Sequence, residues 1–281
     1  MDQEQRKQVQ FIQFSIAKAF DQFCSSNDIN YWLEGGSLLG AIRHEGPIPW
    51  DDDFDVAMLR KDYEKFLELF QHTQENSLFF IQNWDTDDSY PHAFSKLGLK
   101  GSLYKENAVS TTNFEQAIFI DIFPYDNAPN SVIARKIQKN STRILRKTYS
   151  LKSGVGLKFN KKVSGKRLGS YLLLMIGNII GKQLLKKRLY KTATKYRFTD
   201  TKYIYSVGTS YKYEKKLFLK EWVQNTTRVQ YKNYKFSAPK EWEKYLTHVF
   251  GDYMELPSKE KQIGGHDIIS FDVGKNYMKL N

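Results

Sequence analysis

The stretch that decides the fold is GGSLLGAIRHEGPIPWDDDFDVAMLRKDYEKF, residues 35–66. It opens with a glycine-serine turn, and the apolar residues that follow predict one or two helical turns capped by the Ser37 side chain. After a proline-containing loop, residues 53–58 alternate polar and apolar side chains, which is typical of a β-strand. Residues 61–71 then return to helical periodicity. This order predicts a mixed α and β domain built around an acidic strand.

The acidic strand carries the chemistry that we predict. Residues two apart on a strand point to the same face, so Asp53 and Asp55 present neighbouring carboxylates. Such carboxylates raise each other's pKa unless a positive charge lies between them. Mg²⁺ or Mn²⁺ is the simplest such charge, because both ions prefer carboxylate oxygens. Asp51 and Asp52 are predicted to support this site or cap the loop, and the alternative for the whole run is a solvated acidic turn.

A second strand supplies a third acid. Residues 117–123 are rich in β-branched and aromatic side chains, and Pro124 is predicted to end the strand. Asp121 shares one face of this strand with two phenylalanines. An acid in so apolar a strand needs a cation, hydrogen bonds or solvent. We therefore predict that Asp121 is the third metal ligand, with an edge-strand acid facing water as the alternative.

Regular elements extend this core on both sides. Apolar residues recur at helical spacing from Val9 to Phe23 and predict an N-terminal helix, followed by a short strand at residues 30–33. Towards the other end, residues 231–236 predict a strand. A helix is expected from Ala238 to about Phe250, where a glycine stops it.

The positive charge is concentrated in one segment. The formal net charge is +12, yet no Asp or Glu lies between Asn127 and Thr199, a stretch that holds 19 of the 43 lysines and arginines. The remainder of the chain is mildly acidic. This asymmetry indicates an anionic partner for the segment and not for the whole chain. No recognised RNA- or DNA-binding motif occurs there, so nucleic acid is not the expected partner.

The most apolar run of the chain, residues 171–180, lies inside this basic segment. A helix that spans a bilayer takes roughly 20 apolar residues, so this run is too short to do so. An apolar helix with basic flanks suits a membrane interface. Residues 134–192 are therefore predicted to face an anionic membrane surface, with a buried helix under a solvated basic face as the alternative.

Cysteine usage and the N-terminal sequence bear on the cellular compartment. Cys24 is the single cysteine, which excludes an intramolecular disulfide, and we expect it to be buried on a helix. The first ten residues are polar and lack the apolar core of a secretory signal. We expect a reducing, cytoplasmic setting, with peripheral attachment to the inner face of the membrane.

Three elements together resemble the pattern of the nucleotidyltransferase fold: Gly36-Ser37, Asp53-Phe54-Asp55-Val56 and Asp121. More narrowly, residues 35–66 resemble the signature of the LicD family, the phosphocholine-type transferases of bacterial surface polysaccharides. AIFIDIFPYD at 117–126 and YLTHVFGDYMELP at 245–257, with His266 beyond, extend this resemblance over residues 29–126 and 236–266. The sequence departs from the family pattern at Pro47, Leu59 and Ser258, and none of these changes removes a predicted ligand.

The resemblance implies an α+β (α/β) fold with a nucleotidyltransferase-like core. Its mixed β-sheet would be flanked by helices and would carry a basic helical insertion. The chain would then divide into a catalytic core with the N-terminal helix at residues 1–126, the insertion at 127–199, and a C-terminal part at 200–281 that completes the domain.

The resemblance also implies a reaction. Phosphocholine, or another alcohol phosphate, would move from CDP-choline or another CDP-alcohol to a hydroxyl of a glycan precursor, and CMP would leave. The glycan would be of the teichoic acid, capsule or lipopolysaccharide type and polyprenyl-linked. The metal ligands and catalytic residues would be Asp53, Asp55 and Asp121. The donor phosphates would contact Gly35, Gly36, Ser37, Arg43 and Lys96, and the supporting residues would be Asp51, Asp52 and His266.

A choline end would need an aromatic face, for which Trp32, Trp50 and Trp84 are candidates. Two other functions fit the same residues. A true nucleotidyltransferase that acts on a small molecule or RNA would share the metal site and attack a different phosphorus. A non-catalytic protein that binds a membrane surface or a polyanion would use the basic segment alone, although the intact set of three acids argues against it.

Overall fold

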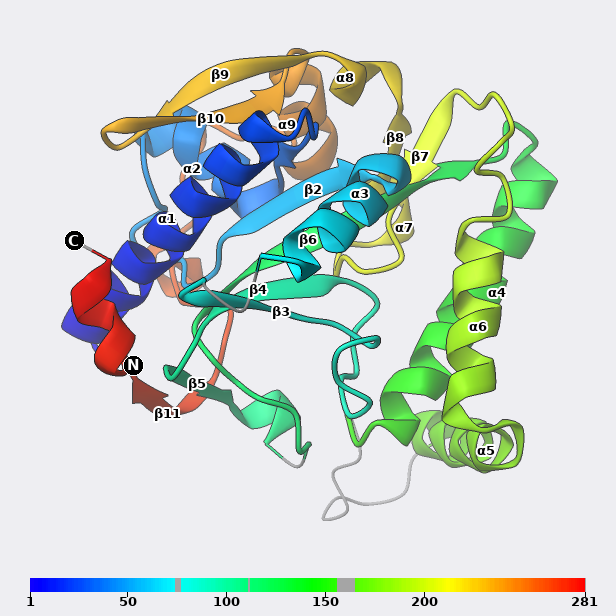
Figure 1. The fold of residues 1–281 in the computed structure, drawn as a ribbon. Coiled ribbons are helices and arrows are strands. Elements are labelled where there is room, and N and C mark those ends of the chain that lie inside the picture. The colour runs from blue at the N-terminus through cyan, green and yellow to red at the C-terminus, as the bar shows by residue number, and fades with distance from the viewer. Residues whose placement is uncertain (74–76, 111, 156–164, 281) are drawn as a thin grey trace.

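The computed structural model describes residues 1–73, 77–110, 112–155 and 165–280 (Figure 1). Its main sheet has the order β1-β2-β6-β4-β3, and β6 also pairs with β7, which pairs with β8. Strands β2 and β6 are parallel, and the other pairs in this sheet are antiparallel. The strands are β1 (Trp32–Leu33), β2 (Asp55–Leu59), β3 (Phe79–Gln82), β4 (Ser95–Leu99), β6 (Phe119–Ala128), β7 (Tyr203–Tyr205) and β8 (Leu217–Leu219).

Helices flank this mixed sheet, which confirms the predicted α+β fold class. Helices α1 and α3 pack on strands β2, β4 and β6, and α2 lies near α9 (Figure 1). The helices of the core are α1 (Gln3–Ser26), α2 (Gly35–His44), α3 (Arg60–Gln71), α7 (Tyr213–Lys216), α8 (Glu221–Gln224) and α9 (Trp242–Phe250). Two small antiparallel pairs complete the core: β5 (Leu103–Glu106) with β11 (Ile268–Asp272), and β9 (Thr226–Tyr231) with β10 (Tyr234–Pro239). Short 3-10 turns occur at Asn107–Val109, Lys259–Lys261 and Lys275–Lys279.

Helix α1 forms where the apolar periodicity predicts it, and it also has an N-terminal cap that was not predicted. Asp2 caps the helix by accepting a hydrogen bond from the Gln5 N–H, and the Gln5 side chain accepts one from the Asp2 N–H. Val9, Ile12 and Ile16 of its apolar stripe are fully buried, whereas Ala19 and Phe23 are partly buried. Cys24 is buried on the same helix, as expected.

Helix α2 differs from the prediction at its start. It begins at Gly35, so Ser37 lies inside the helix and does not cap it. The Ser37 hydroxyl instead accepts a hydrogen bond from the backbone N–H of Asp55 at 2.7 Å. The serine that the sequence assigned to local capping therefore fixes the start of β2, a contact between distant residues that local pattern does not encode.

Pro124 does not end β6, contrary to the prediction. The strand continues to Ala128, with Pro124 paired to Met58 of the parallel neighbour. On the other edge of β6, pairing with β4 stops at Ile122 and pairing with β7 starts at Asp126. Pro124 lies in this gap, where its missing N–H breaks no pairing with β4 or β7, so the strand tolerates it.

The prediction of one strand at residues 231–236 is also corrected. Tyr231 ends β9 and Tyr234 begins β10, with a two-residue turn between them. Lys232 adopts φ 55° in this turn, a left-handed conformation that residue type alone does not indicate for lysine. Because β10 extends to Pro239, α9 begins at Trp242 and not at Ala238.

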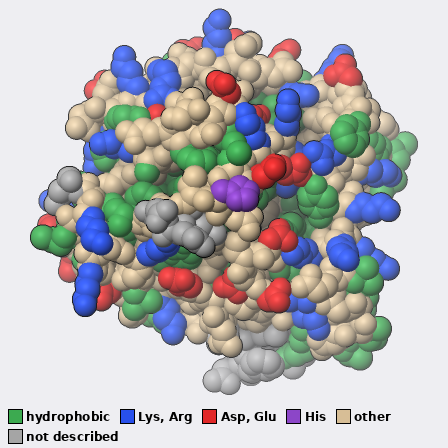
Figure 2. Space-filling model, in the orientation of Figure 1, with side chains coloured by type: hydrophobic (Ala, Val, Ile, Leu, Met, Phe, Trp, Pro, Cys, Tyr) green, Lys and Arg blue, Asp and Glu red, His purple; other side chains and the backbone are tan. Residues whose placement is uncertain are grey.

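The basic segment folds as helices beside the core, at the right of Figure 1. They are α4 (Val132–Lys152), α5 (Gly165–Ile180) and α6 (Lys182–Ala193). The part of the segment at residues 156–164 lies outside the described residues. No helix of the described chain is long and apolar enough to cross a membrane. Figure 2 shows lysine and arginine side chains interspersed with hydrophobic ones on this side of the molecule.

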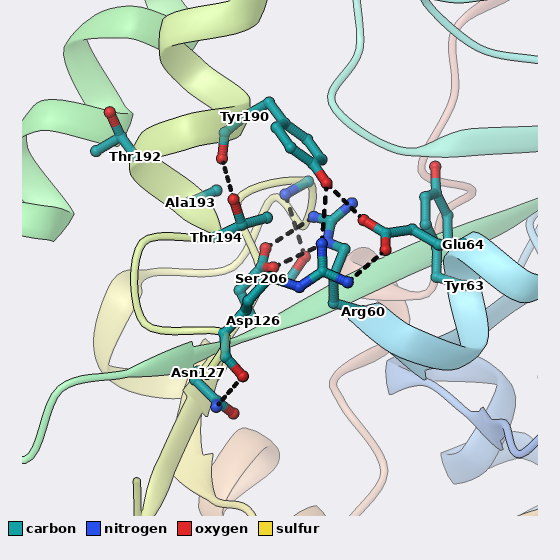
Figure 3. Close-up of polar contacts among 12 residues, drawn as sticks. Arg60, Tyr63, Glu64, Asp126, Asn127, Tyr190, Thr192, Ala193, Thr194 and Ser206 are labelled. Carbon is teal, nitrogen blue, oxygen red and sulfur yellow. Dashed lines mark hydrogen bonds and ion pairs between the residues drawn. The ribbon is translucent and has the colours of Figure 1, made fainter. Parts of the chain in front are cut away.

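Polar contacts fix the end of the helical insertion to the core (Figure 3). Arg60 of α3 forms two hydrogen bonds with the Asp126 carboxylate, each 2.8 Å long. Glu64 accepts hydrogen bonds from the Tyr190 hydroxyl at 2.7 Å and from Arg197 at 2.8 Å. These bonds join strand β6, helix α3 and the last turn of α6.

Candidate active site

Two of the predicted ligands meet at the centre of the sheet. Asp55 is the first residue of β2, and its Cα partner in parallel β6 is Asp121. On the other side of β6, Lys96 is the Cα partner of Asp121, and its ammonium lies 3.0 Å from Asp121 Oδ1. The register thus brings together two carboxylates and one cation from three neighbouring strands.

Asp53 precedes β2, so the predicted strand begins two residues too early. Its side chain nevertheless lines the same cavity as Asp51 and Asp55. Burial raises the pKa of all three above the ordinary value, and repulsion from Asp53 raises it further at Asp51 and Asp55. Asp51, which was predicted to have a supporting place, is part of the cavity wall.

The cavity has a volume of about 720 Å³ and is open on one side to solvent. Its walls come from α2, the loop before β2, the segment 209–211 and the loop after α9. Its charged and aromatic lining residues include Glu34, Arg43, Trp50, Asp51, Asp53, Asp55, Tyr211, Phe250, Asp252, Tyr253, Glu255 and Lys261. Asp51, Asp53 and Asp55, here called the acidic wall, come from the segment that leads into β2, whereas Tyr211, Phe250 and Tyr253 of the aromatic wall come from segment 209–211, the end of α9 and the loop after it.

Asp52 points away from this wall and fixes a distant loop. Its Oδ1 accepts hydrogen bonds from the Gly265 N–H at 3.0 Å and is 3.0 Å from His266 Nδ1. Burial alone would lower the pKa of His266, but the Asp52 hydrogen bond and nearby carboxylates such as Glu106 raise it to about 9. Gly264 is required here because a Cβ would lie 2.7 Å from Asp52 Oδ2. Asp52 and His266 thus pair as a loop anchor beside the site.

Glu34 is a cavity residue that the sequence analysis missed. It accepts hydrogen bonds from the Tyr125 hydroxyl at 2.6 Å and the Trp32 indole N–H at 3.0 Å. Burial raises its pKa to about 6 against the opposite effect of these donors. A charged residue between an apolar strand and Gly35-Gly36 is a signal that could have identified Glu34. Its hydrogen-bond partner Tyr125 could not be predicted, because it is remote in the sequence.

The two glycines make room for side chains. Gly35 has φ +50°, and a Cβ there would lie 2.7 Å from the Tyr211 hydroxyl. A Cβ on Gly36 would lie 2.8 Å from Asp51 Oδ2. In the predicted phosphate-binding turn, Gly36 lines the cavity, whereas Gly35 and Ser37 do not.

The two predicted phosphate-binding cations have different surroundings. Arg43 lines the cavity and donates from Nη1 to the carbonyls of Tyr253 and Glu255, at 2.8 and 3.2 Å. Lys96 is buried, pairs with Asp121 and lies 2.9 Å from the Phe119 ring centroid. Arg43 is thus placed to meet a ligand in the cavity, and Lys96 neutralises an acid behind it.

Only one of the three candidate tryptophans lines the cavity, namely Trp50. Trp32 is buried against Tyr125, and Trp84 packs edge-on against Tyr149 of α4. Tyr211, Phe250 and Tyr253 supply the other aromatic surfaces of the cavity.

The acidic wall has the chemistry of a site for a hard cation. Asp55 Oδ1 is buried without a hydrogen-bond partner among the described residues, and Asp121 Oδ1 has only the ion-pair contact with Lys96. As the side chains stand, no three His, Cys, Asp or Glu residues of the described chain are grouped closely enough to hold a metal ion. Oxygen ligands with unsatisfied buried lone pairs fit Mg²⁺ or Mn²⁺.

Comparison with known proteins relates the chain to one family. Residues 28–153 match the family described as LicD/FKTN/FKRP, nucleotidyltransferase domain. The chain is 29% identical over 266 residues to the lipopolysaccharide cholinephosphotransferase LicD of Haemophilus influenzae, a match that covers 92% of this chain and 95% of that protein.

Two shorter matches are to eukaryotic proteins. Human ribitol 5-phosphate transferase FKRP is 59% identical over 34 residues, which cover 12% of this chain and 7% of FKRP. Mannosyltransferase regulator 4 of Saccharomyces cerevisiae is 30% identical over 82 residues, 27% of this chain and 7% of that protein. Residues 28–153 therefore match the LicD family domain, and most of the chain is similar to a LicD protein, which confirms the resemblance predicted from residues 35–66.

Proposed function

We propose that this protein transfers phosphocholine, or another alcohol phosphate, from a CDP-alcohol to a hydroxyl of a cell-surface glycan precursor. Two relatives support the reaction class, because one is named a cholinephosphotransferase and the other a ribitol 5-phosphate transferase. The single observation that carries the proposal is the cavity wall formed by Asp51, Asp53 and Asp55, with Asp121 in register behind Asp55.

The reaction is a displacement at phosphorus. The acceptor hydroxyl oxygen bonds to the phosphorus next to the alcohol, the bond to the bridging oxygen breaks, and CMP leaves with that oxygen. Asp53 and Asp55 would hold Mg²⁺ or Mn²⁺, with Asp121 completing the site. When bound, the metal supplies charge neutralisation for the phosphates. The hydroxyl proton must go to a group in the cavity, and Asp51, which lines the cavity as Asp121 does not, is placed to accept it.

The aromatic wall suits the alcohol end of the donor. Trp50, Tyr211, Phe250 and Tyr253 offer ring faces, and Asp252 and Glu255 add negative charge beside them. A quaternary ammonium is attracted by both features. Choline therefore fits this wall better than an uncharged alditol, which would need hydrogen bonds more than ring faces.

The exposed face of α5 supports attachment to the inner face of the membrane. Leu172, Met175, Ile176 and Ile179 recur at helical spacing, and each is about half or more exposed. Lysines of α6 follow at once in the chain. Each well-placed Lys or Arg adds roughly 1 kcal/mol of attraction to an anionic membrane surface. A polyprenyl-linked glycan acceptor would be met at such a surface.

The proposal is tested by incubating the protein with Mg²⁺, a glycan acceptor and CDP-choline or other CDP-alcohols. Release of CMP with modification of the acceptor is the expected result. Release of pyrophosphate from a nucleoside triphosphate would select a true nucleotidyltransferase instead. Vesicle binding without turnover of any donor would select a non-catalytic role.

A further inference from the structure

A second cavity, of about 300 Å³, lies next to the first. It is lined by α4, by β7 and by the segment from Val207 to Lys216. Tyr211 lines both cavities. Thr209 lines the first, and its carbonyl accepts hydrogen bonds from Arg146 and Lys216 of the second, both at 3.3 Å. The two cavities are therefore separated by little more than residues 209–211.

The second cavity is strongly basic. Its cationic lining residues are Lys139, Arg143, Arg146, Lys212 and Lys216, and its one acid is Glu214. Glu214 is paired with Lys139 at 2.7 Å. Among the described residues, the other four cations have no carboxylate partner. The acidic first cavity and the basic second cavity thus present opposite charges on the two sides of Tyr211.

Several polar groups of this cavity are desolvated without an anion to compensate. Arg146 donates only to backbone carbonyls, those of Val207, Gly208 and Thr209. Burial, followed by the charges of Arg146 and Lys139, lowers the pKa of Lys216 to about 8. The Tyr213 hydroxyl is buried and has no hydrogen-bond partner in the described chain. A buried cation without a counter-charge is costly, so this arrangement favours a bound anion.

We propose that the second cavity binds a phosphoryl group of the acceptor substrate. The assignment to the acceptor rests on the proposed function, in which the donor diphosphate occupies the first cavity with its metal. Charge-assisted hydrogen bonds from Arg143, Arg146 and Lys216 and a hydrogen bond from Tyr213 match the oxygens of a phosphate or diphosphate ester. With the anion held there, the rest of the acceptor extends past Tyr211 to the reacting phosphorus.

The first test is calorimetric titration of inorganic diphosphate in EDTA, which removes metal-dependent binding to the acidic cavity. Saturable binding is expected, and Arg143→Gln and Lys216→Gln are each expected to weaken it tenfold or more. Lys215→Gln is the matched control, since Lys215 is an exposed neighbour that does not line the cavity. Arg143 is exposed on α4, so its variant should fold normally even if Lys216→Gln does not. Absence of saturable binding, or equal weakening by Lys215→Gln, overturns the proposal.

The second test assigns the anion to a substrate. Arg143→Gln should raise the KM for the acceptor about tenfold and leave kcat and the KM for the CDP-alcohol unchanged. A rise in the donor KM instead would overturn the acceptor assignment. If the variant weakens binding to phosphatidylglycerol vesicles but not to soluble diphosphate, the anion is a lipid headgroup and the acceptor assignment is also overturned. If no donor releases CMP, the proposed function fails, yet the diphosphate titration still decides whether the anion site exists.

Discussion

Asp55 and Asp121 are Cα partners across the one parallel strand pair of the described main sheet, and Lys96 pairs with Asp121 while Asp55 Oδ1 is buried without a hydrogen-bond partner in the described chain. Parallel register alone sets this proximity, because Asp121 lies 66 positions after Asp55 in the sequence. Neighbouring carboxylates in a protein interior cost stability unless a cation lies between them. The site is therefore arranged for ligand binding at the expense of the apo fold.

Asp55→Asn should abolish turnover without loss of stability. Loss of a metal ligand removes several kcal/mol of transition-state stabilisation, which is a fall in kcat of at least about 100-fold. The amide also removes the buried negative charge, since burial and then repulsion from Asp53 and Asp121 raise the pKa of this carboxyl. CMP release and urea unfolding measure the two effects, with exposed Asp200→Asn as the control. Retained activity would remove Asp55 from the ligand set.

Gly35→Ala should destabilise the protein by about 1–3 kcal/mol, because the backbone there has φ +50° and the Cβ would lie 2.7 Å from the Tyr211 hydroxyl. Gly169→Ala on α5 is the matched control. It meets nothing within 4 Å and should stabilise the helix by about 0.5–1 kcal/mol. Urea unfolding of the two variants gives opposite signs if this explanation holds, and the same sign if it does not.

Asp21 should make the free energy of unfolding depend on pH in the acid range. Burial would raise its pKa, but hydrogen bonds from Arg228, Tyr31 and Tyr234 hold the pKa below 3.8. A depressed carboxyl pKa stabilises the fold above the unfolded value, and this contribution is lost as pH falls through the folded value.

The comparison that checks this is Asp21→Asn against the parent protein in urea unfolding from pH 7 to pH 3. The variant should be less stable by about 2 kcal/mol at pH 7, since Arg228 is partly exposed and the loss is screened. This difference in unfolding free energy between the variant and the parent protein should narrow towards pH 3. A difference in unfolding free energy that stays constant from pH 7 to pH 3 would mean that the ionised Asp21 carboxylate is not the source of the stabilisation.

Anion binding in the second cavity should weaken as pH rises through about 8. Lys216 loses its proton there, because burial and the charges of Arg146 and Lys139 lower its pKa to about 8. Sulfate is the suitable probe, since its own charge does not change in this range. Lys216→Gln should remove the decline above pH 8, whereas Arg143→Gln should weaken binding at every pH and keep the decline.

Met175→Glu and Ile179→Glu should each reduce sedimentation with anionic vesicles several-fold. These side chains are 62% and 85% exposed on α5, and a charge there opposes burial in the membrane interface. Asn140→Glu adds the same charge to an exposed position of α4 and should change sedimentation little. Equal effects of all three variants would indicate net charge alone, without insertion of the apolar face.

Much of the core could be predicted from local pattern. Periodicity identifies α1 and α3, and β-branched composition identifies β6, because each of these elements buries one regular face. Asp53, Asp55 and the remote Asp121 could be selected because an acid among buried apolar residues needs a partner. The pairing of Asp55 with Asp121 in parallel register depends on chain topology, which cannot be predicted from the spacing of residues in the sequence.

The predictions that the structure corrects were wrong for one physical reason: each depends on contacts between residues that are far apart in the sequence. Ser37 holds the Asp55 backbone, and Pro124 lies in a gap between two partners of β6. Glu34 and Tyr211 are brought to the cavity by tyrosine contacts and by the glycine turn. No window of neighbouring residues contains these relations, so sequence pattern could not reveal them.

The helical insertion leaves β6 after Ala128 and returns as β7, which pairs with the end of the same strand. Both of its attachment points are therefore fixed on one rigid element, downstream of Asp121. Replacement of this segment by a longer, shorter or differently charged one would leave the alignment of the acids undisturbed. Under the proposed function, a graft of residues 129–202 from a relative should therefore change the preferred acceptor without moving Asp55 away from Asp121.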